Sequence, residues 1–205
     1  ALDEAETLCD ALDDPPETVS LSRGKIAFWR GDYQSATDIY DTLLAGRNPE
    51  RVALRAVVLH NLGLVDLRVG QYRQATHRLQ EALALFEQNA RYFEATVCRH
   101  NLGIAYEFGQ RLGLAISMFE QTIDGFERLG KQANLAGAIN SLGDLYLGIG
   151  EYWKARRLFE HSQSIAEKNG LDYMCAFNDL RLGQVARLEG DTSDAMERLE
   201  RACSS

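Results

Sequence analysis

Two His-Asn pairs, His60-Asn61 and His100-Asn101, stand 40 residues apart and carry most of the chemistry that the sequence offers. A carboxamide has both a donor and an acceptor, so it matches the N–H and C=O groups of an extended peptide. The alternative is that each Asn ties one helix to the next. Imidazoles can bind a metal, but two His without further ligands make a weak site. We therefore expect no metal.

No catalytic constellation appears elsewhere in the chain. The sequence has no complete Gly-x-x-x-x-Gly-Lys-Ser/Thr phosphate loop, no Gly-x-Ser-x-Gly nucleophile turn and no His-Glu-x-x-His zinc motif. Its carboxylates are scattered along the chain. Because catalysis requires groups that converge on one point, we expect neither an enzymatic activity nor a cofactor.

The His-Asn pairs belong to a repeat of 40 residues. Leu-Gly recurs at this spacing, and an Ala follows each Gly twelve positions later. The copies are Leu62-Gly63, Leu102-Gly103, Leu142-Gly143 and Leu182-Gly183, followed by Ala75, Ala115, Ala155 and Ala195. A fixed period of this length is typical of stacked repeats, in which each unit covers its apolar face only against its neighbours.

Each repeat is interpreted as two helices joined by a turn. Apolar residues three and four positions apart mark both helices, and a Gly in a left-handed conformation ends the first. We predict these caps at Gly31, Gly70, Gly150 and Gly190, with a distorted turn where Gly109 stands one place early. Gly inside a helix costs about 1 kcal/mol relative to Ala, so its recurrence predicts close helix crossings at Gly63 and Ala75.

The pattern resembles the tetratricopeptide repeat. The resemblance rests on Leu-Gly, an aromatic residue three positions later (Tyr106, Tyr146), the Ala, and Leu or Phe four positions after it (Leu79, Phe119, Phe159). The 40-residue unit is longer than the usual 34, as in kinesin light chains, polarity scaffolds and MalT-type transcription activators. The resemblance implies an all-α, right-handed solenoid of stacked antiparallel helix hairpins. The chain departs from the pattern at Asp66 and Ala186, where Tyr is usual.

The repeat frame predicts one continuous array over residues 1–205. Its parts are the second helix of a truncated repeat at 1–13, repeats at 20–58, 59–98, 99–138 and 139–178, and a truncated repeat at 179–205. Because both ends lie inside a repeat and no Met begins the chain, we expect a fragment of a longer protein. Its uncapped repeat ends offer a surface through which two copies can form a homodimer.

In the tetratricopeptide family, the first helices line a concave groove that holds a peptide or protein. The resemblance implies the following groove residues: Lys25, Trp29, His60, Asn61, Leu64, Arg68, His100, Asn101, Ile104, Asn140, Asp144, Gln184 and Arg187. Phe108 lies on the same face, but we expect it in the core. The apolar members favour an amphipathic helix or an extended peptide. The Lys and Asn clamp of the chaperone-tail binders is replaced by His60 and Leu64, which argues against that ligand.

Composition argues against other classes of partner. The net charge is −8, and the basic clusters are interrupted by acids, so we expect no nucleic acid to bind. No apolar run reaches the roughly 18 residues that a membrane span needs, and no signal peptide begins the chain; we expect a cytoplasmic location. The four Cys are expected to be small buried residues in a reducing compartment. They are Cys9, Cys98, Cys175 and Cys203.

Two functions fit these observations. The first is a protein–protein interaction scaffold that holds a peptide or protein segment in its groove. The second is the effector-sensing regulatory arm of a signalling ATPase or transcription activator. Flanking sequence would separate them, since a nucleotide-binding module favours the sensor and further repeats favour the scaffold.

Overall fold

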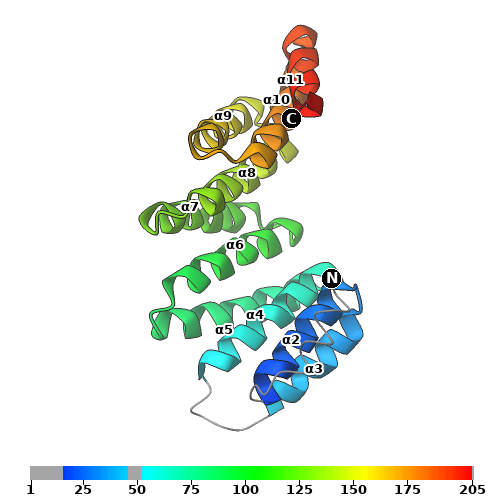
Figure 1. Cartoon of the computed structure of the whole chain (residues 1–205), viewed down its shortest axis with the longest axis vertical. Coiled ribbons are helices and arrows are strands. Elements are labelled where there is room, and N and C mark those ends of the chain that lie inside the picture. Colours follow the sequence, from blue (N-terminus) through cyan, green and yellow to red (C-terminus); the bar gives the residue numbers. More distant parts are fainter. Residues whose placement is uncertain (1–15, 46–51, 205) are drawn as a thin grey trace. The chain divides into compact units, whose positions relative to one another are not determined.

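The computed structural model describes residues 16–45 and 52–204, which form ten helices and no strand (Figure 1). They divide into two compact units, and the division falls between Arg111 and Leu112. Unit 1 contains α2 (Pro16–Trp29), α3 (Tyr33–Ala45), α4 (Val52–Arg68), α5 (Tyr72–Gln88) and α6 (Tyr92–Phe108). Unit 2 contains α7 (Leu112–Arg128), α8 (Gln132–Gly148), α9 (Tyr152–Asn169), α10 (Asp172–Glu189) and α11 (Thr192–Ser204). The helix predicted at 1–13 lies outside the described residues.

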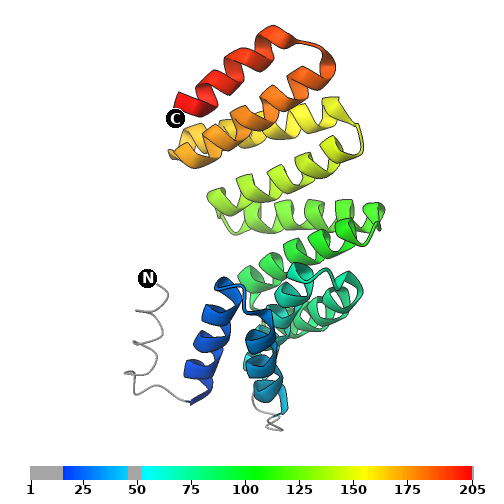
Figure 2. The same ribbon diagram turned by 90° about the vertical axis from the view of Figure 1, so that its right-hand side faces the viewer.

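Consecutive helices pack against one another within each unit (Figure 2). In unit 1, α2 and α3 form one hairpin, α4 and α5 form the next, and α6 packs on α5; α2 and α6 both contact α4. In unit 2, α8 pairs with α9 and α10 with α11, while α7 packs on α8 and α10 also contacts α8. Within each unit, the predicted all-α stack of helix hairpins is confirmed.

The 40-residue period is exact in the helices themselves. Three first helices begin at Tyr92, Gln132 and Asp172, and each Leu-Gly pair lies in the C-terminal half of its helix. The predicted repeats begin three residues before each Leu-Gly pair and not at the first residue of a helix. Residues 59, 99, 139 and 179 therefore fall inside helices, seven positions after a helix begins.

The turns after the first helices use a left-handed residue, as predicted. Gly70 has φ +79°, and the same sign occurs at Gly31, Gly150 and Gly190. The distortion predicted at Gly109 is wrong, because Gln110 takes the left-handed position with φ +59°. The N–H of Arg111 still donates to the Tyr106 carbonyl at 2.8 Å, so the turn keeps its hydrogen bond. The left-handed conformation of Gln110 costs about 1 kcal/mol, because Gln has a Cβ and Gly does not.

Glycines inside the first helices allow close helix crossings, as predicted. A Cβ at Gly63 would lie 2.7 Å from Leu79 Cγ, and one at Gly143 would lie 2.7 Å from Phe159 Cε1. Both of these partner side chains are fully buried. Leu79 supplies the atoms nearest to a Cβ at Gly63, and Ala75 is fully buried.

The cysteines do not share one environment. Cys98 is buried, its thiol donates to the Leu79 carbonyl at 3.3 Å, and burial raises its pKa to about 12. Cys175 is half-buried, and Cys203 is exposed near the end of α11. The prediction of buried cysteines is correct for Cys98 and wrong for Cys203, and Cys9 lies outside the described residues.

Two further observations limit what the described helices can do. None of them is long and apolar enough to cross a membrane. In the same part of the chain, no three His, Cys, Asp or Glu side chains lie close enough together to hold a metal ion.

Candidate functional site

An apolar cavity of about 520 Å³ opens on unit 1. Its walls come from α2, α4 and α6, which are first helices of three repeats, and from the start of α5. It is lined by Phe28, Trp29, His60, Leu64, Leu67, Arg68, Tyr72, Val97, Asn101, Ile104 and Phe108. We call it the groove cavity.

Six of the predicted groove residues line this cavity: Trp29, His60, Leu64, Arg68, Asn101 and Ile104. Sequence reasoning missed Phe28, Leu67, Tyr72 and Val97. Val97 could have been found, because it lies one helical turn before Asn101 on the same face. Tyr72 could not, because it belongs to a second helix.

The prediction that Phe108 is a core residue is wrong. Its side chain is 55% exposed and stacks on Tyr72 with ring centroids 5.4 Å apart. Phe108 is the last residue of α6, and its ring lies against Tyr72 at the start of α5. The pair of rings therefore forms part of the cavity wall, and Trp29, at 68% exposure, forms another part of its rim.

A polar pair lies within this otherwise apolar cavity. Asn101 Nδ2 is 2.9 Å from His60 Nε2, across neighbouring first helices. The pKa of His60 is lowered to about 4, chiefly by burial and also by the charge of Lys25, against a hydrogen bond with Asn61 that raises it. The imidazole is therefore neutral at pH 7, and Nε2 can accept the amide hydrogen when Nδ1 carries the ring proton. A side-chain hydrogen bond also joins Asn101 to His100, so the carboxamide is held between two imidazoles and keeps its second N–H for a ligand.

One cation stands at the cavity rim. The Arg68 guanidinium lies over the Phe28 ring, 5.9 Å from its centroid. Lys25 is exposed on α2 and is not among the lining residues. No carboxylate lines the cavity within the described chain, so the groove cavity is apolar with a positive edge.

Asn61 and His100, also predicted for the groove, do not line the cavity. Asn61 is only 8% exposed, and its Nδ2 has no hydrogen-bond partner among the described residues. His100 is half-buried, and burial lowers its pKa. Equivalent positions of the repeat thus differ: Asn101 faces the cavity and Asn61 faces the interior.

The predicted groove residues of unit 2 contact other side chains of that unit. Arg181 Nε is 2.9 Å from Asp144 Oδ1, and Arg181 donates to Gln184 Oε1 at 3.2 Å. Asn140, at 4% exposure, donates to the sulfur of Met174 at 3.0 Å. Arg187 is exposed.

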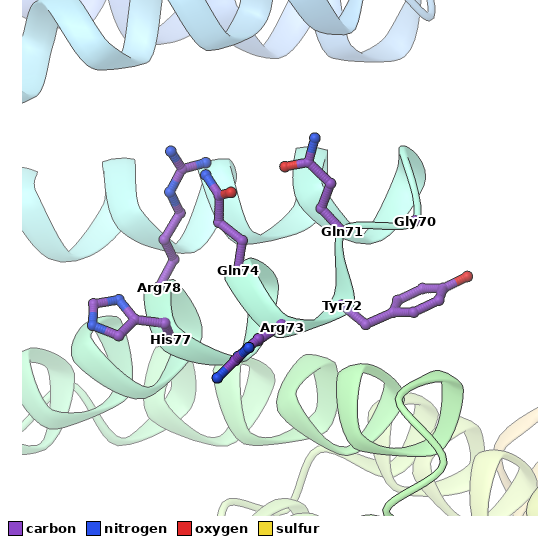
Figure 3. A pocket seen from close by; sticks show the side chains of 7 residues that line it. All are labelled: Gly70, Gln71, Tyr72, Arg73, Gln74, His77 and Arg78. Atoms are coloured by element: carbon purple, nitrogen blue, oxygen red, sulfur yellow. The ribbon is translucent and has the colours of Figure 1, made fainter.

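A second hollow of about 730 Å³ runs along the start of α5 (Figure 3). Gln71, Gln74 and Arg78 project from one side of the helix, whereas Arg73 and His77 point away from them (Figure 3). The polar groups that line this hollow do not all converge on one point, so they do not form a catalytic constellation.

Residues 125–132 match part of the phosphate-loop pattern but do not form such a loop. Gly125, Gly130 and Lys131 have the required spacing, but Gln132 follows in place of Ser or Thr. Gly125 lies inside α7, so its backbone N–H groups are not free to cradle a phosphate.

Comparison with known proteins shows a repeat protein. A family model described as tetratricopeptide repeat matches residues 17–88 and 93–168, whereas no curated protein matches the chain.

Solved structures of similar fold include three that cover almost the whole chain. BtubC from P. vanneervenii is 18% identical, with a TM-score of 0.81 over 99% of this chain and 87% of that one. The Rap conjugation gene regulator of plasmid pLS20, in complex with the Phr* peptide, is 19% identical, with a TM-score of 0.72 over 92% and 52%. A signal transduction ATPase from Pyrococcus horikoshii with a tetratricopeptide repeat sensor is 13% identical, with a TM-score of 0.87 over 98% and 31%. At these identities, the likeness shows the fold alone.

Proposed function

Since the chain belongs to the tetratricopeptide repeat family and is a protein-interaction module, we propose that it binds a peptide or protein segment over the groove cavity of unit 1. The observation that carries the proposal is the cavity itself: three first helices leave about 520 Å³ open between apolar side chains. Exposed apolar surface of this kind costs free energy in water and is typical of binding sites.

The cavity is suited to one bulky apolar side chain of the ligand. Leu64, Val97 and Ile104 form aliphatic walls, and the exposed rings of Trp29 and Phe108 stand at the edge. Burying an apolar side chain there contributes about 1.5–3 kcal/mol. This contribution makes the cavity the anchor of the proposed interaction.

The His60–Asn101 pair can fix the orientation of the ligand's backbone. Asn101 is held by His60 at 2.9 Å and by a hydrogen bond with His100, and its second N–H can donate to a backbone carbonyl of an extended segment. A complex with a peptide is known for the Rap regulator, and this supports a peptide as the ligand class here. We propose no catalytic step for this site.

The second candidate, an effector-sensing arm, is favoured by one observation. The signal transduction ATPase that matches over 98% of this chain carries its tetratricopeptide repeats as a sensor. A sensory arm would bind its effector in the same groove cavity, so the binding test below applies to both candidate functions.

The test is a peptide selection followed by calorimetry. A library of random dodecapeptides is selected on the 205-residue protein, and the enriched peptides are titrated into wild type, Ile104→Glu and Gln184→Glu. Gln184 is the matched control, because it occupies the same repeat position in unit 2. We expect Ile104→Glu to weaken binding at least about tenfold and Gln184→Glu to leave it unchanged. Failure to enrich any peptide, or equal binding by Ile104→Glu, overturns the proposal.

A further inference from the structure

A buried carboxylate stands where other repeats have a ring. Asp66 takes the position of Tyr106 and Tyr146, and it is only 3% exposed. Among the described side chains its hydrogen-bonding partner is Arg78, whose Nη1 lies 3.0 Å from both carboxylate oxygens. A carboxylate can accept about four hydrogen bonds and a guanidinium can donate five, so both groups keep unused capacity.

A cavity of about 210 Å³ lies beside this ion pair, between α3, α4 and α5. We call it the Asp66 cavity. It is lined by Tyr33, Gln34, Thr37, Val65, Asp66, Val69, Gln71, Gln74 and Arg78. It shares no residue with the groove cavity, so it is a separate site.

The unused hydrogen-bonding groups come from α4 and α5. On α3, Gln34 donates to Asp38 and Thr37 donates to the Tyr33 carbonyl. The side chains of Gln71 and Gln74, in contrast, have no hydrogen bond with any described residue. They project from the same side of α5 as Arg78 (Figure 3). The cavity thus joins an ion pair and two carboxamides that can all still bind a ligand.

We propose that the Asp66 cavity binds a free α-amino acid in its zwitterionic form. The ligand's ammonium contacts the Asp66 carboxylate, and its carboxylate contacts the Arg78 guanidinium. Charge-assisted hydrogen bonds of this kind are about twice as strong as neutral ones.

The charge of the cavity selects this ligand class. The lining charges cancel, because Asp66 and Arg78 are its two ionic groups within the described chain. A simple anion would be repelled by Asp66 and a simple cation by Arg78, whereas a zwitterion satisfies both.

The size and walls of the cavity limit the ligand's side chain. A volume of about 210 Å³ corresponds to roughly seven water molecules at about 30 Å³ each. This is enough for an amino acid with a short or branched side chain and too little for a peptide. Val65 and Val69 form an apolar strip on the α4 side, so an aliphatic side chain fits best. The proposal goes beyond the groove ligand and does not depend on it.

The test uses L-leucine and two derivatives that each lack one charge. L-leucine, N-acetyl-L-leucine and L-leucinamide are titrated separately into ¹⁵N-labelled protein at pH 7.5, and amide shifts are followed by NMR. We expect L-leucine to shift the amide resonances of residues around Asp66 and Arg78 with a Kd near or below about 1 mM. Both derivatives should bind at least about tenfold more weakly.

Variants at position 66 supply the matched control. Asp66→Tyr restores the residue found at 106 and 146, which fills the cavity with a ring that this fold accommodates elsewhere. We expect it to stay folded and to lose the L-leucine response, while Ile104→Glu, in the groove cavity, keeps it. The proposal is overturned if L-leucine gives no saturable shift, if either derivative binds equally well, or if Asp66→Tyr responds like wild type.

Discussion

The first-helix faces of the two units share a scaffold and differ in what they offer a partner. At one repeat position, unit 1 has Leu64 and Ile104 where unit 2 has Asp144 and Gln184. The former line an open apolar cavity. The latter both contact Arg181, which pairs with Asp144 and stacks on Phe177 at 5.0 Å.

The difference shows which repeat positions can vary. The residues that pack between helices recur, because Gly63 and Gly143 meet a buried Leu79 and Phe159 at the same distance. The face residues do not pack between helices of one hairpin, so they can change type without disturbing the stack. In unit 1 they leave apolar surface exposed, and in unit 2 they satisfy one another.

The strongest test of the shared scaffold is overpacking at the helix crossing. Gly143→Leu would bring its Cβ to 2.7 Å from the Phe159 ring, and we expect it to lower the free energy of unfolding by about 3 kcal/mol. Gly63→Leu should cost a similar amount. Urea denaturation measures both.

The matched control is a glycine on the same helix with free space around it. Apart from the backbone of α8 itself and the residues adjacent in sequence, no atom lies within 4 Å of a Cβ placed at Gly137, so Gly137→Ala should stabilise α8 by up to about 1 kcal/mol through helix propensity. Wild-type stability in Gly143→Leu would show that the crossings are not close.

The second test uses pH, since the first helices of unit 1 carry half-buried histidines and those of unit 2 carry no histidine. The pKa of His60 falls from its ordinary 6.5 to about 4 on folding. The unfolded chain therefore binds the proton first, and stability is lost as pH falls from 6.5 towards 4. Relative to His60→Gln, wild type should lose roughly 2–3 kcal/mol over that range.

Denaturation curves of both proteins at several pH values measure this loss. Asp66 acts in the opposite direction, because burial raises its pKa to about 6, so the folded state gains protons and stability as pH falls below 6. Its effect is common to wild type and variant and cancels in the difference. If the free energy of unfolding changed with pH equally in wild type and His60→Gln, His60 would not be the group whose protonation destabilises the fold.

The third test concerns the Asn positions of the repeat. Asn101→Ala should weaken the selected peptides about tenfold, because it removes the donor and acceptor inside the groove cavity. Ser141→Ala, at the same repeat position in unit 2, should not. Asn61 is buried away from the cavity, so Asn61→Ala should change stability rather than affinity. Calorimetry and thermal unfolding separate the two effects, and an unchanged affinity in Asn101→Ala would remove this residue from the binding site.

The smallest expected effect is at the turn between the two helices of a repeat. Gln110 occupies the left-handed position that Gly150 occupies in unit 2. We expect Gln110→Gly to raise the free energy of unfolding by up to about 1 kcal/mol and Gly150→Gln to lower it by a similar amount. Thermal melts are sufficient, and a destabilised Gln110→Gly would indicate that the Gln side chain makes a contact that matters.

Much of the fold could be predicted because its signals are local. Helix periodicity, the left-handed glycines and the Leu-Gly pairs each depend on residues within about one repeat. The candidate site was predicted only in part: Trp29, Leu64 and Ile104 share the expected face, but Tyr72 enters from a second helix. Phe108 was misplaced because its ring stacks on Tyr72 of a second helix, which spacing along one helix does not reveal.

By itself, the sequence determined the period, the pairing of helices into hairpins and the close crossings, since these follow from residue types at fixed spacing along one or two helices. Only the tertiary structure decided that His60 meets Asn101, that Asp66 is buried against Arg78 beside a cavity, and that Asp144 pairs with Arg181. The physical reason is distance: such contacts join side chains on separate helices, and a difference of a few ångströms decides between an open cavity and a closed contact.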